Sequence, residues 1–105
     1  MTAQDFIRRK SRERRVKWSR HALNEIAVES FTVSDVESAL QRAEVIEEYP
    51  PQHRYLPDCL ILAFVTGDLP SHVVIGLNEL HDYILIVTVY HPNAEEWEHD
   101  WRTRK

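Results

Sequence analysis

Three apolar stretches decide the fold: residues 59–66 (CLILAFVT), 71–78 (SHVVIGLN) and 83–90 (YILIVTVY). Their β-branched and aromatic residues are typical of strands, and the nearly continuous apolar character of the first predicts a central strand covered on both faces. Short connections between the stretches favour antiparallel neighbours. A further strand is expected upstream at 44–49 (EVIEEY), where Pro50 and Pro51 suit the end of an edge strand. The sequence therefore predicts a four-stranded antiparallel meander.

The alternation of side chains along these strands predicts which residues face the core. On the 71–78 strand the expected core residues are Val73, Ile75 and Leu77. Pairing of Thr66 with Ser71 across the intervening turn would add three residues to the same layer: Leu60, Leu62 and Phe64.

The last hairpin decides where His72 lies. A three-residue loop at 80–82 would place His72 opposite Tyr90 and Val74 opposite Thr88, whereas a two-residue loop would exchange the faces of the last strand. The three-residue loop is favoured because it sends three apolar residues to the core: Leu85, Val87 and Val89. The other face then carries His72, Thr88 and Tyr90 among apolar side chains and needs a cover.

Helices are expected on both sides of the strands in the sequence. Ser19 is a candidate N-cap for a first helix, and Ser34, followed three residues later by Glu37, predicts a second helix that begins with a capping box. After Pro92, residues 94–104 suggest a final helix with Trp97 and Trp101 on one face, which could cover the sheet; a second copy of the chain is the alternative cover. The predicted fold is α+β, with two N-terminal helices, the meander and a C-terminal helix.

The charge is distributed unevenly along the 105 residues. The whole chain carries a net charge of −4, yet residues 1–20 hold eight basic and two acidic side chains. We therefore divide the chain into a basic N-terminal arm, residues 1–16, and a single α+β domain, residues 17–105. Three roles remain open for the arm: contacting phosphates, folding back on its own body, or docking on an acidic partner.

Composition narrows the class of protein. The chain is 43% hydrophobic and 29% charged, as in soluble globular proteins, and no apolar run approaches the roughly 20 residues of a membrane helix. Cys59 is the only cysteine, which excludes an internal disulfide and a cysteine-based metal cluster. We expect a cytoplasmic protein without membrane contact, cofactor or metal site; the six histidines show no ligand spacing such as HExxH.

Four short segments, taken in order, carry a resemblance to a known family. They are residues 18–22 (WSRHA), 45–50 (VIEEYP), 72–74 (HVV) and 88–92 (TVYHP), with Trp97 after them. Together they resemble the bacterial domain-of-unknown-function family 4258 over about residues 17 to 101. This family is thought to be a distant branch of the RelE-like and BrnT-like toxin ribonucleases. The resemblance therefore implies a RelE/barnase-like fold.

The resemblance implies a metal-independent ribonuclease of toxin–antitoxin type. The positions that it implies as catalytic are His21, His72, Thr88 and Tyr90, with the two histidines as the acid–base pair. Candidate phosphate ligands are Arg20 and Arg54, the latter because it lies in the loop between Pro51 and Pro57. The chain departs from the family in one respect, because it lacks the arginines that members carry further along the first helix.

Each of these residues also has a structural interpretation. His21 suits a latch that bonds helix to strand, His72 suits a sheet-face histidine bonded to Tyr90, and Thr88 and Tyr90 are ordinary strand formers. Two functional hypotheses follow. One is the ribonuclease, with RNA and an antitoxin-like protein as partners. The other is a non-catalytic interaction module of the same fold, which forms a homodimer or binds a partner protein.

Overall fold

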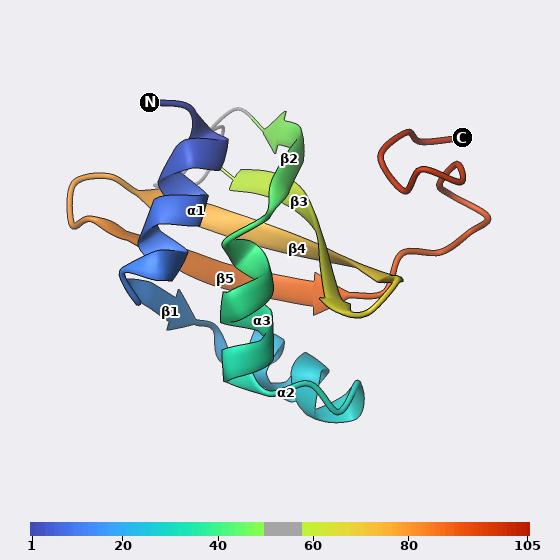
Figure 1. Ribbon diagram of the computed structural model, residues 1–105, viewed down its shortest axis with the longest axis horizontal. Helices are drawn as coiled ribbons and strands as arrows, with labels where there is room; N and C mark the ends of the chain where they lie inside the picture. Colours follow the sequence, from blue (N-terminus) through green and yellow to red (C-terminus); the bar gives the residue numbers. More distant parts are fainter. Residues whose placement is uncertain (50–57) are drawn as a thin grey trace.

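The computed structural model describes residues 1–49 and 58–105, and within them the chain forms three helices and a five-stranded mixed sheet (Figure 1). The elements in order are α1 (Ala3–Arg12), β1 (Val16–Trp18), α2 (Arg20–Val28), α3 (Val33–Leu40), β2 (Glu44–Tyr49), β3 (Asp58–Thr66), β4 (Leu69–Asn78) and β5 (Tyr83–Tyr90). The strand order is β1-β5-β4-β3-β2. The α+β class and the antiparallel meander from β2 to β5 are confirmed, including β2 as an edge strand.

The prediction of a purely antiparallel, four-stranded sheet is wrong because β1 adds a fifth strand. β1 pairs in parallel with β5, Lys17 lying opposite Leu85. With only three residues, β1 is too short for an alternation of polar and apolar side chains to be recognised. Its position is fixed instead by tertiary pairing.

Helix α1 contains most of the segment predicted to be a basic arm. Thr2 and Asp5 form a capping box at its start, and Phe6 and Ile7 are buried in the same core as the rest of the chain. The Nε atom of Arg8 also donates a hydrogen bond to the Ala43 carbonyl at 2.7 Å. Of the three roles left open for this segment, the structure shows the second, a segment folded back on its own body.

The helix starts follow local capping. Ser19 caps α2 as predicted, because its Oγ accepts from the Ala22 amide at 3.0 Å. The prediction for α3 is wrong by two residues: Thr32, not Ser34, is the cap. Thr32 Oγ accepts from the amide of Asp35 at 3.0 Å and the Asp35 carboxylate accepts from the amide of Thr32 at 3.1 Å, which completes a capping box two residues earlier.

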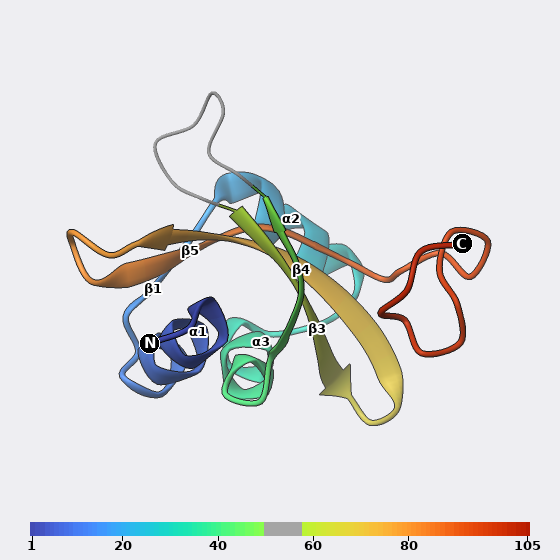
Figure 2. The same cartoon turned by 90° about the horizontal axis from the view of Figure 1, so that it is seen from above.

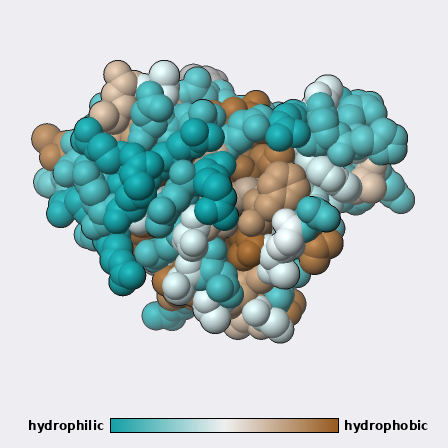
Figure 3. Space-filling model, in the orientation of Figure 1, coloured by the Kyte–Doolittle hydropathy of each residue, from teal (hydrophilic) through white to brown (hydrophobic). Residues whose placement is uncertain are grey.

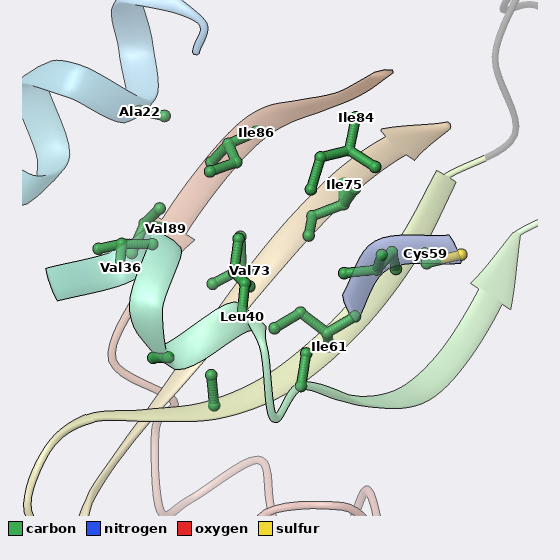
Figure 4. Close-up of a cluster of buried hydrophobic side chains, with 14 of the residues drawn as sticks. Ala22, Val36, Leu40, Cys59, Ile61, Val73, Ile75, Ile84, Ile86 and Val89 are labelled. Atoms are coloured by element: carbon green, nitrogen blue, oxygen red, sulfur yellow. The ribbon is translucent and has the colours of Figure 1, made fainter. Parts of the chain in front are cut away.

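The core lies between the sheet and the helices. α1 and α3 lie side by side on one face of the sheet, seen from above in Figure 2. Apolar side chains from the sheet point toward them, as Figure 4 shows for Ile61, Val73 and Ile75 facing Leu40. The predicted core positions of β4 are confirmed; they are Val73, Ile75 and Leu77.

The predicted pairing of β3 with β4 is wrong. Thr66 pairs with Leu69 rather than Ser71, across a two-residue turn in which Gly67 has φ +55°. This left-handed conformation favours glycine and makes the tighter turn accessible. The turn alone moves the partner of Thr66 by two residues, which would keep the faces. A β-bulge between Phe64 and Thr66 then shifts the register once more, so that Phe64 pairs with Pro70 and the faces of β3 are exchanged.

The core face of β3 therefore consists of Cys59, Ile61 and Ala63. The residues predicted for it lie on the other face: Leu60 and Leu62 are buried there, and Phe64 is 41% exposed.

The predicted pairing of β4 with β5 is correct at the end of the hairpin that contains His72 and wrong near the loop. His72 lies opposite Tyr90 and Val74 opposite Thr88, as expected. A β-bulge then shifts the register so that Ile75 faces Ile86, and the loop has four residues, 79–82. As a result Ile84 and Ile86 join Val89 in the core, while the predicted core residues Leu85 and Val87 are half-buried.

The predicted C-terminal helix at 94–104 is absent. Asn93 and Asp100 instead accept backbone hydrogen bonds from residues that follow them, and such Asx turns compete with helix formation. Trp101 has φ +61°, which ends any helical path, and Trp97 forms an isolated bridge with Arg104. The C-terminal segment, residues 91–105, is thus a looped cover, and Trp97 within it is buried against the sheet.

No helix in residues 1–49 and 58–105 combines the length and apolar character that crossing a membrane requires.

Candidate functional site

Among the described residues, three of the four predicted catalytic residues share one face of the sheet, and His72 lies at their centre. It lies on the face of β4 opposite α1 and α3 and is fully buried. Its ring meets Trp97 edge-on at 4.5 Å between centroids and Tyr90 at 5.6 Å. The C-terminal segment therefore closes over the imidazole.

The hydrogen bonding of His72 fixes its tautomer. Nε2 lies 2.8 Å from the Trp101 carbonyl oxygen, and since a carbonyl only accepts, Nε2 carries the proton. Nδ1 is buried and has no hydrogen-bond partner among the described residues. Burial lowers the pKa of His72 and outweighs the opposing effects of the Trp101 carbonyl and of Glu47. The imidazole is consequently held neutral.

An ion-pair network ties the cover to the edge of the sheet. Arg104 donates to both carboxylate oxygens of Glu47 on β2, at 2.7 and 3.1 Å, and its guanidinium stacks over Trp97 at 4.6 Å. Tyr49 donates to the same Glu47 carboxylate at 2.7 Å. Burial, followed by this hydrogen bond, raises the pKa of Tyr49 to about 12. Arg102 pairs with Glu44 next to it, so two arginines anchor the cover.

His21, the predicted partner of His72, lies apart from this cluster. It is on the first turn of α2 with 69% of its side chain exposed, and its Nε2 is 3.4 Å from Glu25 in the next turn. Among the described residues no hydrogen bond or ring contact joins His21 to His72. Glu25 also accepts from the Val89 amide at 2.8 Å, so the helix-to-strand latch assigned to His21 is made by Glu25 instead.

Thr88 and Tyr90 share the face of His72. Both are half-buried on β5, opposite Val74 and His72 respectively. Tyr90 contacts the His72 ring by its edge rather than through the hydrogen bond that the structural interpretation of His72 proposed. Burial raises the pKa of Tyr90, so its phenol stays protonated.

The predicted phosphate ligands are not brought to His72. Arg20 is exposed at the start of α2, and Arg54 lies outside the described residues. Residues 1–49 and 58–105 contain no cluster of three or more metal-ligating side chains. Cys59 is buried, and that burial raises its pKa to about 11, which makes it a packing residue rather than a nucleophile.

A basic groove was missed by the sequence-based search for sites. It has a volume of about 540 Å³ and is lined by Arg14, Arg15, Val16, Lys17, His81 and Tyr83. The high density of basic residues before Trp18 was the available signal. Their meeting with the β4–β5 loop depends on the parallel pairing of β1 with β5, which the sequence did not reveal.

One comparison with known proteins gives a match, and that match covers most of the sheet. No curated protein and no solved structure matches the chain, so its likeness to RelE-like and BrnT-like toxins stays a prediction. A family described as a domain of unknown function, DUF4258, matches residues 18–91. The match runs from the end of β1 through β5 and contains His21, His72, Thr88 and Tyr90. The chain therefore belongs to the DUF4258 family.

Proposed function

We propose that this protein is a non-catalytic protein-interaction module. The observation that carries the proposal is the burial of His72 beneath Trp97, with its Nε2 proton committed to the Trp101 carbonyl. A general acid or base must come within hydrogen-bond reach of the proton that it transfers. His72 meets that condition only if the C-terminal segment leaves the sheet.

The rest of the ribonuclease hypothesis is equally unsupported by geometry. His21 is solvent-exposed on another element, and the two arginines of the cover are paired with Glu44 and Glu47 rather than free for phosphate. Cleavage of a phosphodiester needs both proton-transfer groups and cations around one reacting atom. The face around His72 instead shows the paired charges and packed rings of a structural contact.

A groove at the end of α2 is the contact site that we assign to the partner protein. This apolar groove, of about 390 Å³, is formed by residues 29–31, 66, 69, 70 and 91. Leu69 on its wall is 56% exposed, and Val28, which precedes Glu29 of the groove in the sequence, is 84% exposed. Figure 3 shows hydrophobic surface over this end of the β3–β4 hairpin.

The shape of the apolar groove favours a different protein over a second copy of this chain. A two-fold dimer sets the same patch against itself, and a concave patch does not complement itself. A partner segment with protruding apolar side chains fits, with Glu29 and His91 as polar groups at the rim. Burying such side chains would contribute about 1.5–3 kcal/mol each.

The first test is cleavage of bulk RNA by the purified chain in EDTA, beside His21→Ala and His72→Gln. The glutamine amide can still donate to the Trp101 carbonyl, so the variant should keep its fold, which circular dichroism checks. We expect all three proteins to leave the RNA intact. Cleavage that survives EDTA in the wild type and disappears in both variants would overturn the non-catalytic assignment in favour of the ribonuclease.

The second test addresses the apolar groove. Peptides selected from a random display library on the wild-type chain should be rich in apolar residues and lose binding to Leu69→Asp, a substitution at an exposed position. Leu80→Asp is the matched control, since Leu80 is 85% exposed in the β4–β5 loop at the other end of the hairpin. Equal binding to both variants, or no selection at all, would refute the groove as a docking site.

A further inference from the structure

The basic groove is built where three segments far apart in sequence meet. The α1–β1 loop supplies Arg14 and Arg15, β1 supplies Lys17, and the β4–β5 hairpin supplies His81 and Tyr83. Figure 1 shows β1 and the tip of this hairpin at the same end of the sheet, opposite the C-terminus. The surface over this end is strongly hydrophilic (Figure 3).

The walls of the basic groove are held by specific hydrogen bonds. Arg15 donates from Nε to the Asp82 carbonyl at 2.6 Å and from its terminal nitrogen to the His81 carbonyl at 3.3 Å. The Arg15 carbonyl accepts from the Ile84 amide at 3.0 Å, next to the β1–β5 pairing. Arg14 takes the left-handed conformation, φ +59°, and its amide donates to the Ser11 carbonyl. The cations are thus presented by an ordered backbone.

The acidic groups nearest to the basic groove are already neutralised. Lys10, whose side chain is only 1% exposed, reaches Asp82 at 2.6 Å and Glu13 at 2.7 Å from behind. The hydrogen bond from Lys10 holds the pKa of each of these carboxyls below its ordinary value, so both stay ionised and paired. Arg14 and Lys17 pair with no carboxylate in the described part of the chain. Their charges remain available to an anion.

The basic groove also holds an aromatic ring beside these charges. The Lys17 ammonium lies 4.4 Å from the centre of the Tyr83 ring, and His81 lines the same space. Cations that contact a backbone, with aromatic rings on which bases stack, are the combination used to bind single-stranded nucleic acid. A carboxylate-rich peptide would satisfy the cations but leave the rings unused.

We propose that the basic groove binds single-stranded nucleic acid, with phosphates on Arg14 and Lys17 and a base against Tyr83. This binding goes beyond the proposed protein contact, because the groove lies at the opposite end of the β4 strand from the apolar groove. It requires no cleavage.

The test is fluorescence anisotropy of a labelled oligouridylate of twelve nucleotides with the full-length protein at several salt concentrations. Two phosphate contacts predict that log K falls with log salt with a slope of about −1.4, since each contact on a single strand contributes about −0.7. Arg14→Gln and Lys17→Gln should each weaken binding about fivefold and reduce the slope by about 0.7. Lys105→Gln is the control, because it removes the same charge at the C-terminus, far from the groove.

Two further arms decide the kind of ligand. Tyr83→Leu should weaken oligouridylate binding because the base can no longer stack on the Tyr83 ring. The slope of log K against log salt should not change. Oligoglutamate should bind more weakly than the oligonucleotide and should not respond to Tyr83→Leu. Equal affinity for oligoglutamate would overturn the assignment in favour of an acidic peptide. Absence of binding at low salt, or an equal loss in Lys105→Gln, would overturn the site itself. Each variant's thermal unfolding by circular dichroism verifies that it is folded.

Discussion

Replacing Trp97 by alanine should detach the cover from the sheet. Trp97 is 3% exposed and lies between the His72 ring and the Arg104 guanidinium. The missing helix was expected to place Trp97 and Trp101 over this face of the sheet, and Trp97 is buried there. The substitution therefore tests whether that segment is a structural part of the domain.

The expected loss follows from the area that Trp97 buries. A tryptophan buries roughly 200 Å². At about 25 cal/mol per Å² this gives an upper bound of about 5 kcal/mol for the contribution of the side chain. Since the alanine retains part of the contact and the segment regains freedom, we expect the free energy of unfolding to fall by about 3–4 kcal/mol. That is a large share of the roughly 5–15 kcal/mol that holds a small domain together.

Urea unfolding followed by circular dichroism measures this loss. With a slope of about 1.5 kcal/mol per molar, the midpoint should fall by about 2 M. Trp101→Ala is the matched control: this side chain is half-buried, and its contact with His72 uses only the backbone carbonyl, so the midpoint should fall by less than about 0.7 M. A Trp97 variant as stable as the wild type would refute the inference that the segment is part of the folded core.

Three further predictions concern single side chains. Ser19→Ala should lower the free energy of unfolding by about 2 kcal/mol, measured in urea, because Ser19 both caps α2 and donates to the Val87 carbonyl at 2.8 Å. The pKa of His72 is lower in the folded chain than its ordinary 6.5, so the unfolded chain binds the extra proton; stability should therefore fall as pH drops below about 6.5, and His72→Gln should flatten that limb of the pH profile. A wild-type profile that is level between pH 6.5 and 5 would contradict this. Cys59, with its pKa raised to about 11, should react with iodoacetamide at pH 8 only in denaturant, as mass spectrometry can show; rapid labelling of the native chain would count against its burial.

The meander was predictable because its signal is local and strong. Residues 59–90 are rich in β-branched and aromatic side chains, and the bounds predicted for β2 and β5 agree with the structure. The pairing of His72 with Tyr90 followed from the same alternation. These features depend on neighbours in sequence, which is the information that a single sequence contains.

The errors arose where one residue decides between alternatives. Gly67 permits a two-residue turn, but it is the bulge between Phe64 and Thr66 that exchanges the faces of β3, and the bulge beside Val74 does the same for the start of β5. The C-terminal helix failed for a related reason: turns at Asn93 and Asp100 outweigh a helix whose apolar face consists of two tryptophans. Trp97 nevertheless covers the sheet face that the sequence said needed covering.

The side chains that cover His72 lie outside the part of the chain that matches the family. His72 and Tyr90 lie within the residues that match DUF4258, whereas Trp97, Trp101 and Arg104 lie beyond residue 91. The matched region alone would present a histidine and a tyrosine side by side on an open sheet, an arrangement suited to proton transfer. Trp97, in the segment after the match, packs edge-on against the imidazole, and burial lowers the pKa of His72 although the hydrogen bond to the Trp101 carbonyl opposes that shift. The access of solvent to His72 therefore depends on residues outside the family match, and the stability lost in Trp97→Ala measures how much the buried tryptophan contributes to the fold that covers it.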